Sequence, residues 1–462
     1  MIHTHNKPDN SSLLNSMEDL PDDLVEVFIR FLSKVSFIVF AHVNKRYHRK
    51  ITKYAISRSI PRPLECHEIA TEGSLEVMKW ARSIGRLWDY RTCDLAAKNG
   101  HFDILKWAKV NGCEWTSDTC AHIAYHGNLE VLKWVINYGC KWSLQAGQFA
   151  ALNGHLHILV WAQENNYEWA LNACTAAAQG GHLEILKWVH RMNQMADFEE
   201  SKLNGDTRNF DLSILHSDVC ARAAENGHLE VLRWARSNGC SWESDVCVGA
   251  AENGHLEILQ WARNPELVPE GNICDWNSDV CERAAKNGHF GVLQWAILNG
   301  CLWDSRVCKR AAENGHLEIL QWAVFHGCKW DSDTCTCAAE NGHLDILKWA
   351  RSNGCKWDSS TCAFAAKNGH FEILKWLRDP LEVPNGSICP WDHRTCSWAA
   401  LNGHFEILKW ARFSGCPWTQ NVCASATEQG HLNIIQWALI NGGECDPYTE
   451  KIIKQKWPNL FC

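Results

Sequence analysis

The stretch that decides the fold is residues 328–354, which read CKWDSDTCTCAAENGHLDILKWARSNG. Equivalents of its Gly342–Ala350 segment occur 13 times, and of the 12 intervals between their glycines nine are 27 residues, two are 34 and one is 46. The tryptophans follow this period: of 26, 13 occupy the position of Trp349 and 11 that of Trp330, which leaves Trp398 and Trp457. Such a fixed period indicates a repeat array in which each unit contacts only its neighbours.

Each unit predicts two short helices. Ser332 or Asp333 can cap the first helix, and the Asn-Gly at 341–342 ends it, because glycine adopts the left-handed conformation at helix ends. The second helix is predicted from Leu344 to Ser352, before another Asn-Gly. Its apolar residues cover more than one stripe, as expected of a helix buried between two neighbouring units. The predicted fold class is therefore an all-α helical repeat solenoid.

The recurring Ala-Ala-x-Asn-Gly-His-Leu-Glu-Ile-Leu-Lys, followed by Gly-Cys, resembles the ankyrin repeat over residues 61–447. The resemblance implies an ankyrin-like solenoid of about 13 units that binds proteins. The usual ankyrin period is about 33 residues, so each unit here lacks a stretch between the Gly-Cys and Thr-Cys positions. That stretch forms a β-hairpin in ankyrin repeats. We infer that most units replace it with a tight turn that the tryptophan of Gly-Cys-x-Trp fills.

Three intervals in the array are longer than the rest. Residues 264–273 and 379–388 carry proline and glycine turn signals, and we expect protruding loops or hairpins there. Residues 192–215 are polar and are expected to form an exposed, disordered loop. Residues 1–16 are expected to be a disordered tail, and residues 448–462 a capping segment.

A second module precedes the array in residues 17–52. Pro21 can open a helix at its first turn, and apolar residues follow at helical spacing before a basic segment ends the module. The order Leu-Pro, apolar helix, Phe-Leu, then Val-x-Lys-Arg-aromatic resembles an F-box, with a tyrosine where tryptophan is usual. The resemblance implies that a Skp-type linker protein binds Leu20, Pro21, Leu24, Val27, Phe28, Phe31, Leu32, Val43 and Tyr47. The alternative is a helical cap that shields the first repeat.

Similarity to F-box/ankyrin proteins implies a substrate-recognition subunit of a cullin–RING ubiquitin ligase. The linker and cullin would be partners, and the array would hold an unknown target protein for ubiquitination. The chain would supply proximity and no chemistry, so we expect neither an enzyme nor a cofactor. Short repeats rich in tryptophan and cysteine resemble arrays of protists and their large DNA viruses, and a viral chain would redirect the host's ligase. The alternative is a binding scaffold with no ligase link.

The recurring cysteines, histidines and tryptophans have structural explanations in the period itself. Cysteines recur in pairs seven residues apart, whereas zinc sites favour gaps of two to four residues, so we expect buried packing and no metal site. Eleven histidines follow the repeat glycine and are expected to brace turns. The tryptophan ladder could suggest base stacking, but it is periodic with the core and lacks interleaved basic residues. We therefore predict core packing.

Binding specificity should lie where the units differ. The residues just after the first-helix cysteine vary most, and the predicted target-binding candidates are Arg222, Arg283, Arg310, Phe364 and Trp398. Trp398 is the only tryptophan on a first helix, and it either binds a partner or fills a gap under the long loop nearby.

Composition narrows the class of protein. The 45 Lys and Arg against 53 Asp and Glu leave a net charge of −8, which does not favour nucleic-acid or anionic-membrane binding. No run of about 18 apolar residues predicts a membrane span, and the N-terminal residues lack the apolar segment of a signal peptide. We expect a monomer in the cytoplasm (the host cytoplasm for a viral chain), with the nucleus as a second compartment.

Overall fold

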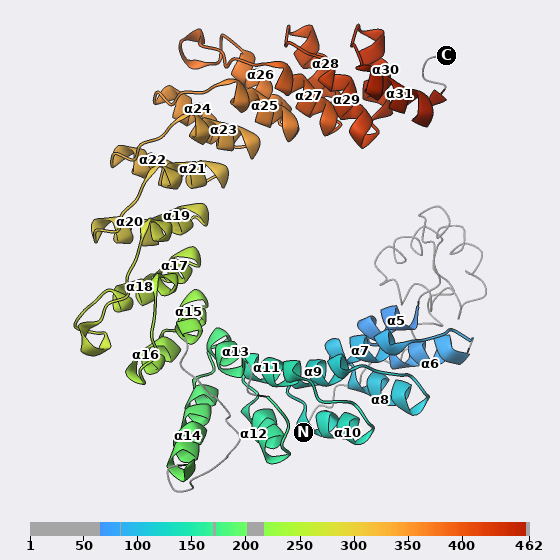
Figure 1. The fold of residues 1–462 in the computed structure, drawn as a ribbon, viewed down its shortest axis with the longest axis vertical. Coiled ribbons are helices and arrows are strands. Elements are labelled where there is room, and N and C mark those ends of the chain that lie inside the picture. The colour runs from blue at the N-terminus through green and yellow to red at the C-terminus, as the bar shows by residue number, and fades with distance from the viewer. Residues whose placement is uncertain (1–64, 84, 170–171, 201–216, 459–462) are drawn as a thin grey trace, which may run out of the picture. The chain divides into compact units, whose positions relative to one another are not determined.

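The structure is a computed structural model that describes residues 65–83, 85–169, 172–200 and 217–458. These ranges contain 27 α-helices and two short 3-10 turns, and no strand occurs within them. The chain divides after Ala177 into two units. We call residues 65–177 the N-terminal array and residues 178–458 the C-terminal array, and describe each by itself (Figure 1). The predicted F-box-like module, residues 17–52, lies outside the described residues.

Helices alternate between the first and the second of each unit. In the N-terminal array they are α5 (Cys66–Glu72), α6 (Leu75–Ser83), α7 (Tyr90–Lys98), α8 (Phe102–Val110), α9 (Ser117–Tyr125), α10 (Leu129–Asn137), α11 (Leu144–Leu152) and α12 (Leu156–Glu164). The boundary between the arrays falls in α13 (Ala173–Gly180).

The C-terminal array continues the alternation. Its helices are α14 (Leu183–Glu200), α15 (Ser217–Glu225), α16 (Leu229–Ser237), α17 (Ser244–Glu252), α18 (Leu256–Ala262), α19 (Ser278–Lys286), α20 (Phe290–Leu298), α21 (Ser305–Glu313), α22 (Leu317–Phe325), α23 (Ser332–Glu340), α24 (Leu344–Ser352), α25 (Ser359–Lys367), α26 (Phe371–Arg378), α27 (His393–Leu401), α28 (Phe405–Phe413), α29 (Asn421–Gln429), α30 (Leu432–Ile440) and α31 (Pro447–Lys456). The last of these packs against α29 and buries Ile453.

First helices pack on first helices. In the C-terminal array, α15 to α29 form one row, and the second helices α16 to α30 form another (Figure 1). The first row packs closely because its buried positions are small: Cys335, Ala338 and Ala339 of α23 are fully buried. The second row carries Ile, Leu and Trp, and these larger side chains hold its helices further apart. We call the row of first helices the inner row.

One detail of the helix ends differs from the prediction. The cap of α23 is Asp331, whose side chain accepts a hydrogen bond from the Asp333 N–H at 3.0 Å, and neither Ser332 nor Asp333 is the cap. The extended backbone of Asp331 places its carboxylate at the free N–H groups of the first turn, whereas Ser332 is already helical. The second helix, α24, has the predicted bounds of Leu344–Ser352.

The repeat glycine and the next unit's histidine form one contact. Gly342 has φ +87°, and the ring of His370 lies where a Cβ on this glycine would be, 2.9 Å from His370 Cε1. The His370 Nε2 also hydrogen-bonds to the Glu340 carbonyl oxygen at 2.9 Å. The histidine therefore braces the helix end of the preceding unit.

This contact recurs along both arrays. Where Asn128 replaces the usual histidine, His126 takes over and bonds the Lys98 carbonyl at 2.9 Å. At the end of the array Trp457 lies over Gly430, 3.8 Å from the position of a Cβ. Each of these glycines is therefore contacted by an aromatic ring, although the residue that supplies the ring differs.

Most tryptophans are half-buried, with basic side chains interleaved, contrary to our prediction from sequence. Seven cations lie 4.0–4.3 Å from the ring centroid of a turn tryptophan in the described residues. Each cation comes from the end of the preceding second helix, six residues before its tryptophan in five units and thirteen residues before it in the two units with a longer loop. Arg351 over Trp357 is typical: its Nη1 also donates to the Cys355 carbonyl at 3.1 Å. These cations fasten the turn.

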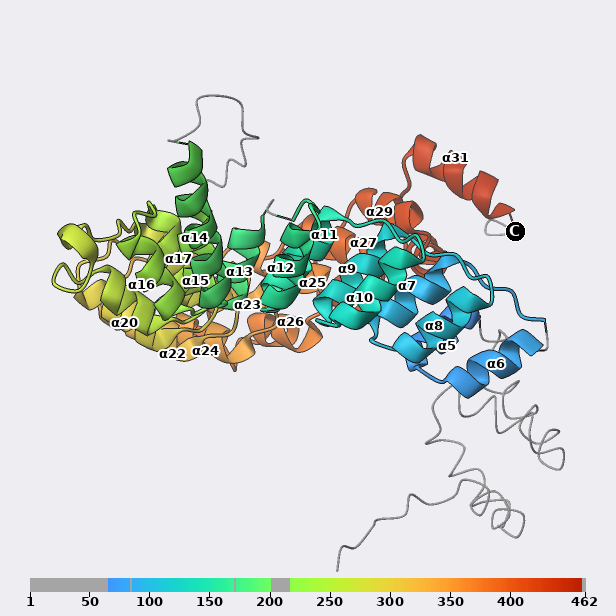
Figure 2. The same ribbon diagram turned by 90° about the horizontal axis from the view of Figure 1, so that it is seen from below.

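Two of the longer intervals form loops, and the third is partly helical. Residues 264–273 and 379–388 form no hairpin; each contains a 3-10 turn, η1 (Pro269–Gly271) or η2 (Pro384–Gly386). Val268 and Val383 are buried, which ties both loops to the array. The expected loop at 192–215 begins as helix, since α14 runs to Glu200 (Figure 2). The Asn-Gly that ends other second helices is missing there, and no glycine or proline interrupts the helix.

We predict that Gly342→Ala destabilises the array more than Gly354→Ala. Both glycines have positive φ (+87° and +88°), so each alanine should cost about 1–2 kcal/mol. Only Gly342 faces a ring, whereas nothing lies within 4 Å of a Cβ at Gly354, and the clash should add about 1–3 kcal/mol. Hydrogen exchange of amides in α23 and α25 measures the difference. Equal exchange rates in the two variants would contradict the role of the His370 contact.

Candidate protein-binding surface

The predicted target-binding residues all lie on the inner row of the C-terminal array. Arg222 is on α15, Arg283 on α19, Arg310 on α21, Phe364 on α25 and Trp398 on α27. They occupy the variable positions that follow the first-helix cysteine, and the helical twist places these positions at the rim of the helix–helix contact. The structure brings two of them, Phe364 and Trp398, into contact, and pairs the three arginines with carboxylates.

Phe364 and Trp398 form an aromatic pair between neighbouring units. Their ring centroids lie 5.0 Å apart at an interplanar angle of 64°, an edge-to-face arrangement that is favourable for aromatic rings. Both side chains are half-buried. Lys367 Nζ lies 5.2 Å from the Phe364 ring centroid, and the Arg394 guanidinium 5.8 Å from that of Trp398. We call these four residues the aromatic patch.

A charged cluster lies nearer the middle of the same row. Glu282 is buried, and its carboxylate accepts hydrogen bonds from Arg306 Nη1 and from Arg310 Nε, the latter at 2.8 Å. Arg306 also bonds Asp279 at 2.9 Å, and Arg310 bonds Glu313 at 2.7 Å. We call these five residues the charged cluster. Most of its charges pair with one another. The cluster therefore fixes the positions of these side chains and leaves little unpaired charge for a partner.

The pKa shifts of the cluster's arginines and of the neighbouring Asp304 follow their hydrogen bonds. Arg306 has a raised pKa because the Asp304 and Asp279 carboxylates accept its hydrogen bonds. The same bond from Arg306 lowers the pKa of Asp304, and hydrogen bonds to Glu282 and Glu313 raise the pKa of Arg310. Each shift favours the charged form of the group at neutral pH.

The other two arginines form simpler pairs. Arg222 Nη1 lies 2.6 Å from Glu225 Oε2 on its own helix. Arg283 Nη1 lies 3.1 Å from Glu252 Oε1 on the preceding inner helix. Both side chains are about half exposed, so such pairs contribute little to stability and leave the arginines accessible to a partner.

Sequence reasoning missed the acidic partners and the flanking cations. Glu282, Arg306, Lys367 and Arg394 were not singled out, although a signal existed. Arg310 and Glu282 are 28 residues apart, and Lys367 and Glu340 are 27 apart. Opposite charges separated by about one period indicate contacts between neighbouring units, and the repeats must be aligned to find them.

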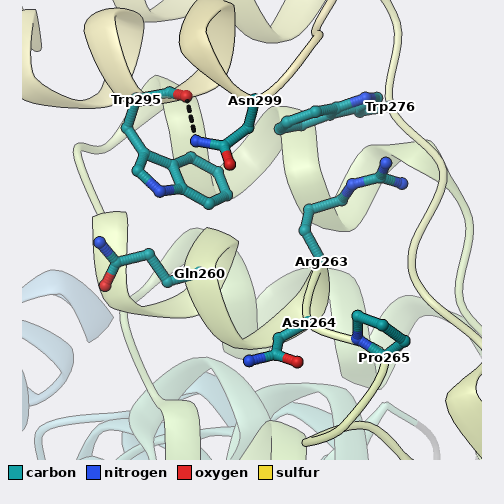
Figure 3. A pocket seen from close by; sticks show the side chains of 7 residues that line it. All are labelled: Gln260, Arg263, Asn264, Pro265, Trp276, Trp295 and Asn299. Atoms are coloured by element: carbon teal, nitrogen blue, oxygen red, sulfur yellow. Dashed lines mark hydrogen bonds between the residues drawn. The ribbon is translucent and has the colours of Figure 1, made fainter.

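A pocket lies near the first long loop, between α18 and α20. It has a volume of about 380 Å³ and is lined by Gln260, Arg263, Asn264, Pro265, Trp276, Trp295 and Asn299 (Figure 3). The Arg263 guanidinium lies 4.3 Å from the Trp276 ring centroid and donates to the Cys274 carbonyl at 2.7 Å. The amide of Asn299 bonds the Trp295 carbonyl, which is a helix-end bond shared by many units. The side chains that line the pocket therefore make the same contacts that stabilise the turns of other units.

The described part of the chain shows no cluster suited to metal chemistry. Within it, no three His, Cys, Asp or Glu side chains form a group that could hold a metal ion. No described helix is long and apolar enough to cross a membrane. The residues proposed to bind a Skp-type linker, Leu20 to Tyr47, lie outside the described ranges, and their role stays a prediction.

Comparison with known proteins identifies part of the array. Residues 335–378 match the family model of ankyrin repeats that occur in many copies. Residues 335–378 are an ankyrin-repeat region. This region runs from within α23 to the end of α26, so it contains Phe364 and Lys367 of the aromatic patch. Ankyrin-type repeats are protein-binding scaffolds, and the region lies within an all-helical repeat array.

The remaining comparisons add little. No curated protein matches the chain. Two similar solved structures are those of the pentatricopeptide repeat protein PPR10 in complex with an 18-nt psaJ RNA element, one of them a cysteine-to-serine variant. Each is 13% identical, with a TM-score of 0.33, and the match covers 94% of this chain and 68% of that chain. Similarity at this level does not define a common fold or ligand.

We predict that Glu282→Ala destabilises the C-terminal array more than Glu313→Ala. Glu282 bonds two arginines and is buried, so its loss leaves both without their shared acceptor. The expected cost is about 2–3 kcal/mol, against less than about 1 kcal/mol for the more exposed Glu313. Thermal unfolding followed by circular dichroism measures both. Equal midpoints would show that the charged cluster does not order the inner row.

Proposed function

We propose that the chain is a protein-binding scaffold whose target docks on the inner row around the aromatic patch. The observation that carries this proposal is the contact of Phe364 with Trp398. These are the two large aromatic side chains among the candidate positions, and they lie together on neighbouring units. In other units of the C-terminal array the same position holds residues such as Arg222, Cys337 or Ser425, and in the N-terminal array His122 and Phe149 occupy it, with ring centroids 6.4 Å apart.

The chemistry of the aromatic patch suits a protein partner. Tryptophan and arginine are enriched among residues that dominate interface energies, and half-buried rings already fixed by a neighbour lose little conformational entropy on binding. The charged cluster lies two units away on the same row and holds its side chains in defined positions. A partner would therefore meet a surface that is ordered before binding.

The finer proposal concerns residues 17–52. We propose that this F-box-like module binds a Skp-type linker through Leu20, Pro21 and the apolar positions that follow, which would place the scaffold in a cullin–RING ubiquitin ligase. The support is the order and spacing of the motif in sequence. A scaffold without a ligase link, with this module as a cap, is the competing proposal.

We predict that Trp398→Ala weakens target binding by roughly 30-fold, the equivalent of a 2 kcal/mol hot spot. The measurement compares proteins captured from lysate by the full chain, identified by cross-linking and mass spectrometry, and then titrated against each variant. Phe325→Ala is the matched control, because Phe325 is 86% exposed and lies at the end of a second helix. Targets bound equally by wild type and Trp398→Ala would contradict the proposed surface.

A separate experiment tests the ligase link. The double variant Leu20→Ala/Pro21→Ala should lose the Skp-type linker and the cullin in a pull-down, while it keeps the target bound by the inner row. The wild type should recover all three. Equal recovery of the linker by both proteins, or by neither, would support the scaffold with a simple N-terminal cap.

A further inference from the structure

Ten pairs of cysteines lie sulfur to sulfur in the two arrays. The two pairs with the clearest geometry are Cys120–Cys140 and Cys220–Cys240, whose Sγ atoms are 2.9 Å and 3.0 Å apart. Each pair joins a first-helix cysteine to the cysteine of the turn that follows the second helix. In eight further pairs the turn cysteine interacts with the first-helix thiol and raises its pKa: Cys93–Cys113, Cys247–Cys274, Cys281–Cys301, Cys308–Cys328, Cys335–Cys355, Cys362–Cys389, Cys396–Cys416 and Cys423–Cys445.

The contacts between cysteines do not follow their seven-residue spacing in the sequence. Cysteines seven residues apart, such as Cys328 and Cys335, belong to different pairs, since Cys328 contacts Cys308 and Cys335 contacts Cys355. The reason is the path of the chain. The second helix runs back along the first helix of the same unit, so the turn after it lies beside the first-helix cysteine, about 20 residues earlier in the sequence. Cysteines that are seven residues apart are close in sequence but do not form the contacting pairs.

In ten units a first-helix cysteine is matched by a cysteine in the following turn, whereas Cys66 and Cys174 have no cysteine in the turn that follows their unit. Where the loop is longer, the turn cysteine moves with it, so that Cys274 and Cys389 still reach Cys247 and Cys362 across 27 residues. Where α11 carries Gly147 instead of cysteine, the turn residue 20 positions on is Tyr167. Packing alone would accept alanine, valine or serine at either position. Retention of both sulfurs in ten pairs points to the chemistry of sulfur.

The thiols of the Cys120–Cys140 pair form a short hydrogen-bonded chain. The Cys120 thiol donates to Cys140 Sγ, and the Cys140 thiol donates to the Thr116 carbonyl oxygen at 3.4 Å. The bond from Cys120 lowers the pKa of Cys140 because it stabilises a thiolate there. In this pair Cys140 is thus the better nucleophile.

We propose that these ten pairs are sites of oxidation to cystine by a two-electron oxidant of the peroxide class, each bond clamping a first helix to the turn that opens the next unit. The turn sulfur attacks a peroxide oxygen and becomes a sulfenic acid with release of water. The first-helix sulfur then attacks the sulfenic sulfur and releases a second water. The sum is two thiols and one hydrogen peroxide to one disulfide and two waters. Because the sulfurs already face each other, little backbone movement is needed to reach bonding distance.

The test maps disulfides in the full chain. The folded protein is treated with hydrogen peroxide at a temperature well below unfolding, and its free thiols are then alkylated in denaturant and mapped by mass spectrometry without reduction. We expect cross-linked peptides in the register Cys335–Cys355, while Cys337, buried on the same helix but outside the ten pairs, stays alkylatable. A bond that closes such a loop should also raise the thermal midpoint, and dithiothreitol should reverse this rise.

Two variants form the matched control. Cys335→Ser should leave Cys355 alkylatable after peroxide while the other nine pairs still cross-link. Cys337→Ser should cross-link all ten. Pairs that stay fully alkylatable, cross-links in another register such as Cys335–Cys337, or sulfinic acids as the only products would each overturn the proposal. The wild-type map decides even if Cys335→Ser fails to fold.

Discussion

The whole array depends on one contact, a histidine ring laid against the glycine of the preceding unit. The glycine has to be glycine for two reasons at once: its backbone is left-handed, and the imidazole occupies the space of a Cβ. The ring nitrogen then satisfies a carbonyl at the end of the first helix, a group that the helix itself leaves unpaired. Each unit is therefore aligned on its neighbour by a directional bond and a steric fit.

The close packing of neighbouring units limits the positions at which their sequences can differ. Close packing of first helices requires alanine and cysteine at the buried positions, so diversity is confined to the rim of the inner row. There the units differ: a buried carboxylate on α19 holds two arginines of α21, and an aromatic pair joins α25 to α27. The second row has a different constraint. The arginines at the ends of its helices pack on turn tryptophans and stabilise the tight turns that stand where ankyrin repeats have hairpins.

Local features followed from the sequence because they depend on residues close in the chain. The bounds of α24 and the left-handed glycines at helix ends come from Asn-Gly and from apolar spacing within one unit. The cap of α23 was misplaced by one or two residues, because several of the residues at 331–333 can cap and only the backbone angles decide which one does. The length of α14 was not predicted, because the polar composition of residues 192–215 suggested a loop. The absence of glycine and proline up to Glu200 was the better indicator, since neither residue interrupts the helix there.

The period of the repeat, the helix pair and the need for glycine at each turn were determined by the sequence alone, since 13 copies leave no other arrangement that buries their common face. Which residues meet between units was decided only by the tertiary structure: Cys335 with Cys355 instead of Cys328, Arg351 over Trp357, Phe364 against Trp398. The physical reason is that these contacts join side chains on different helices of the unit or on neighbouring units. Their pairing depends on how the helices stack and return, which local spacing does not encode.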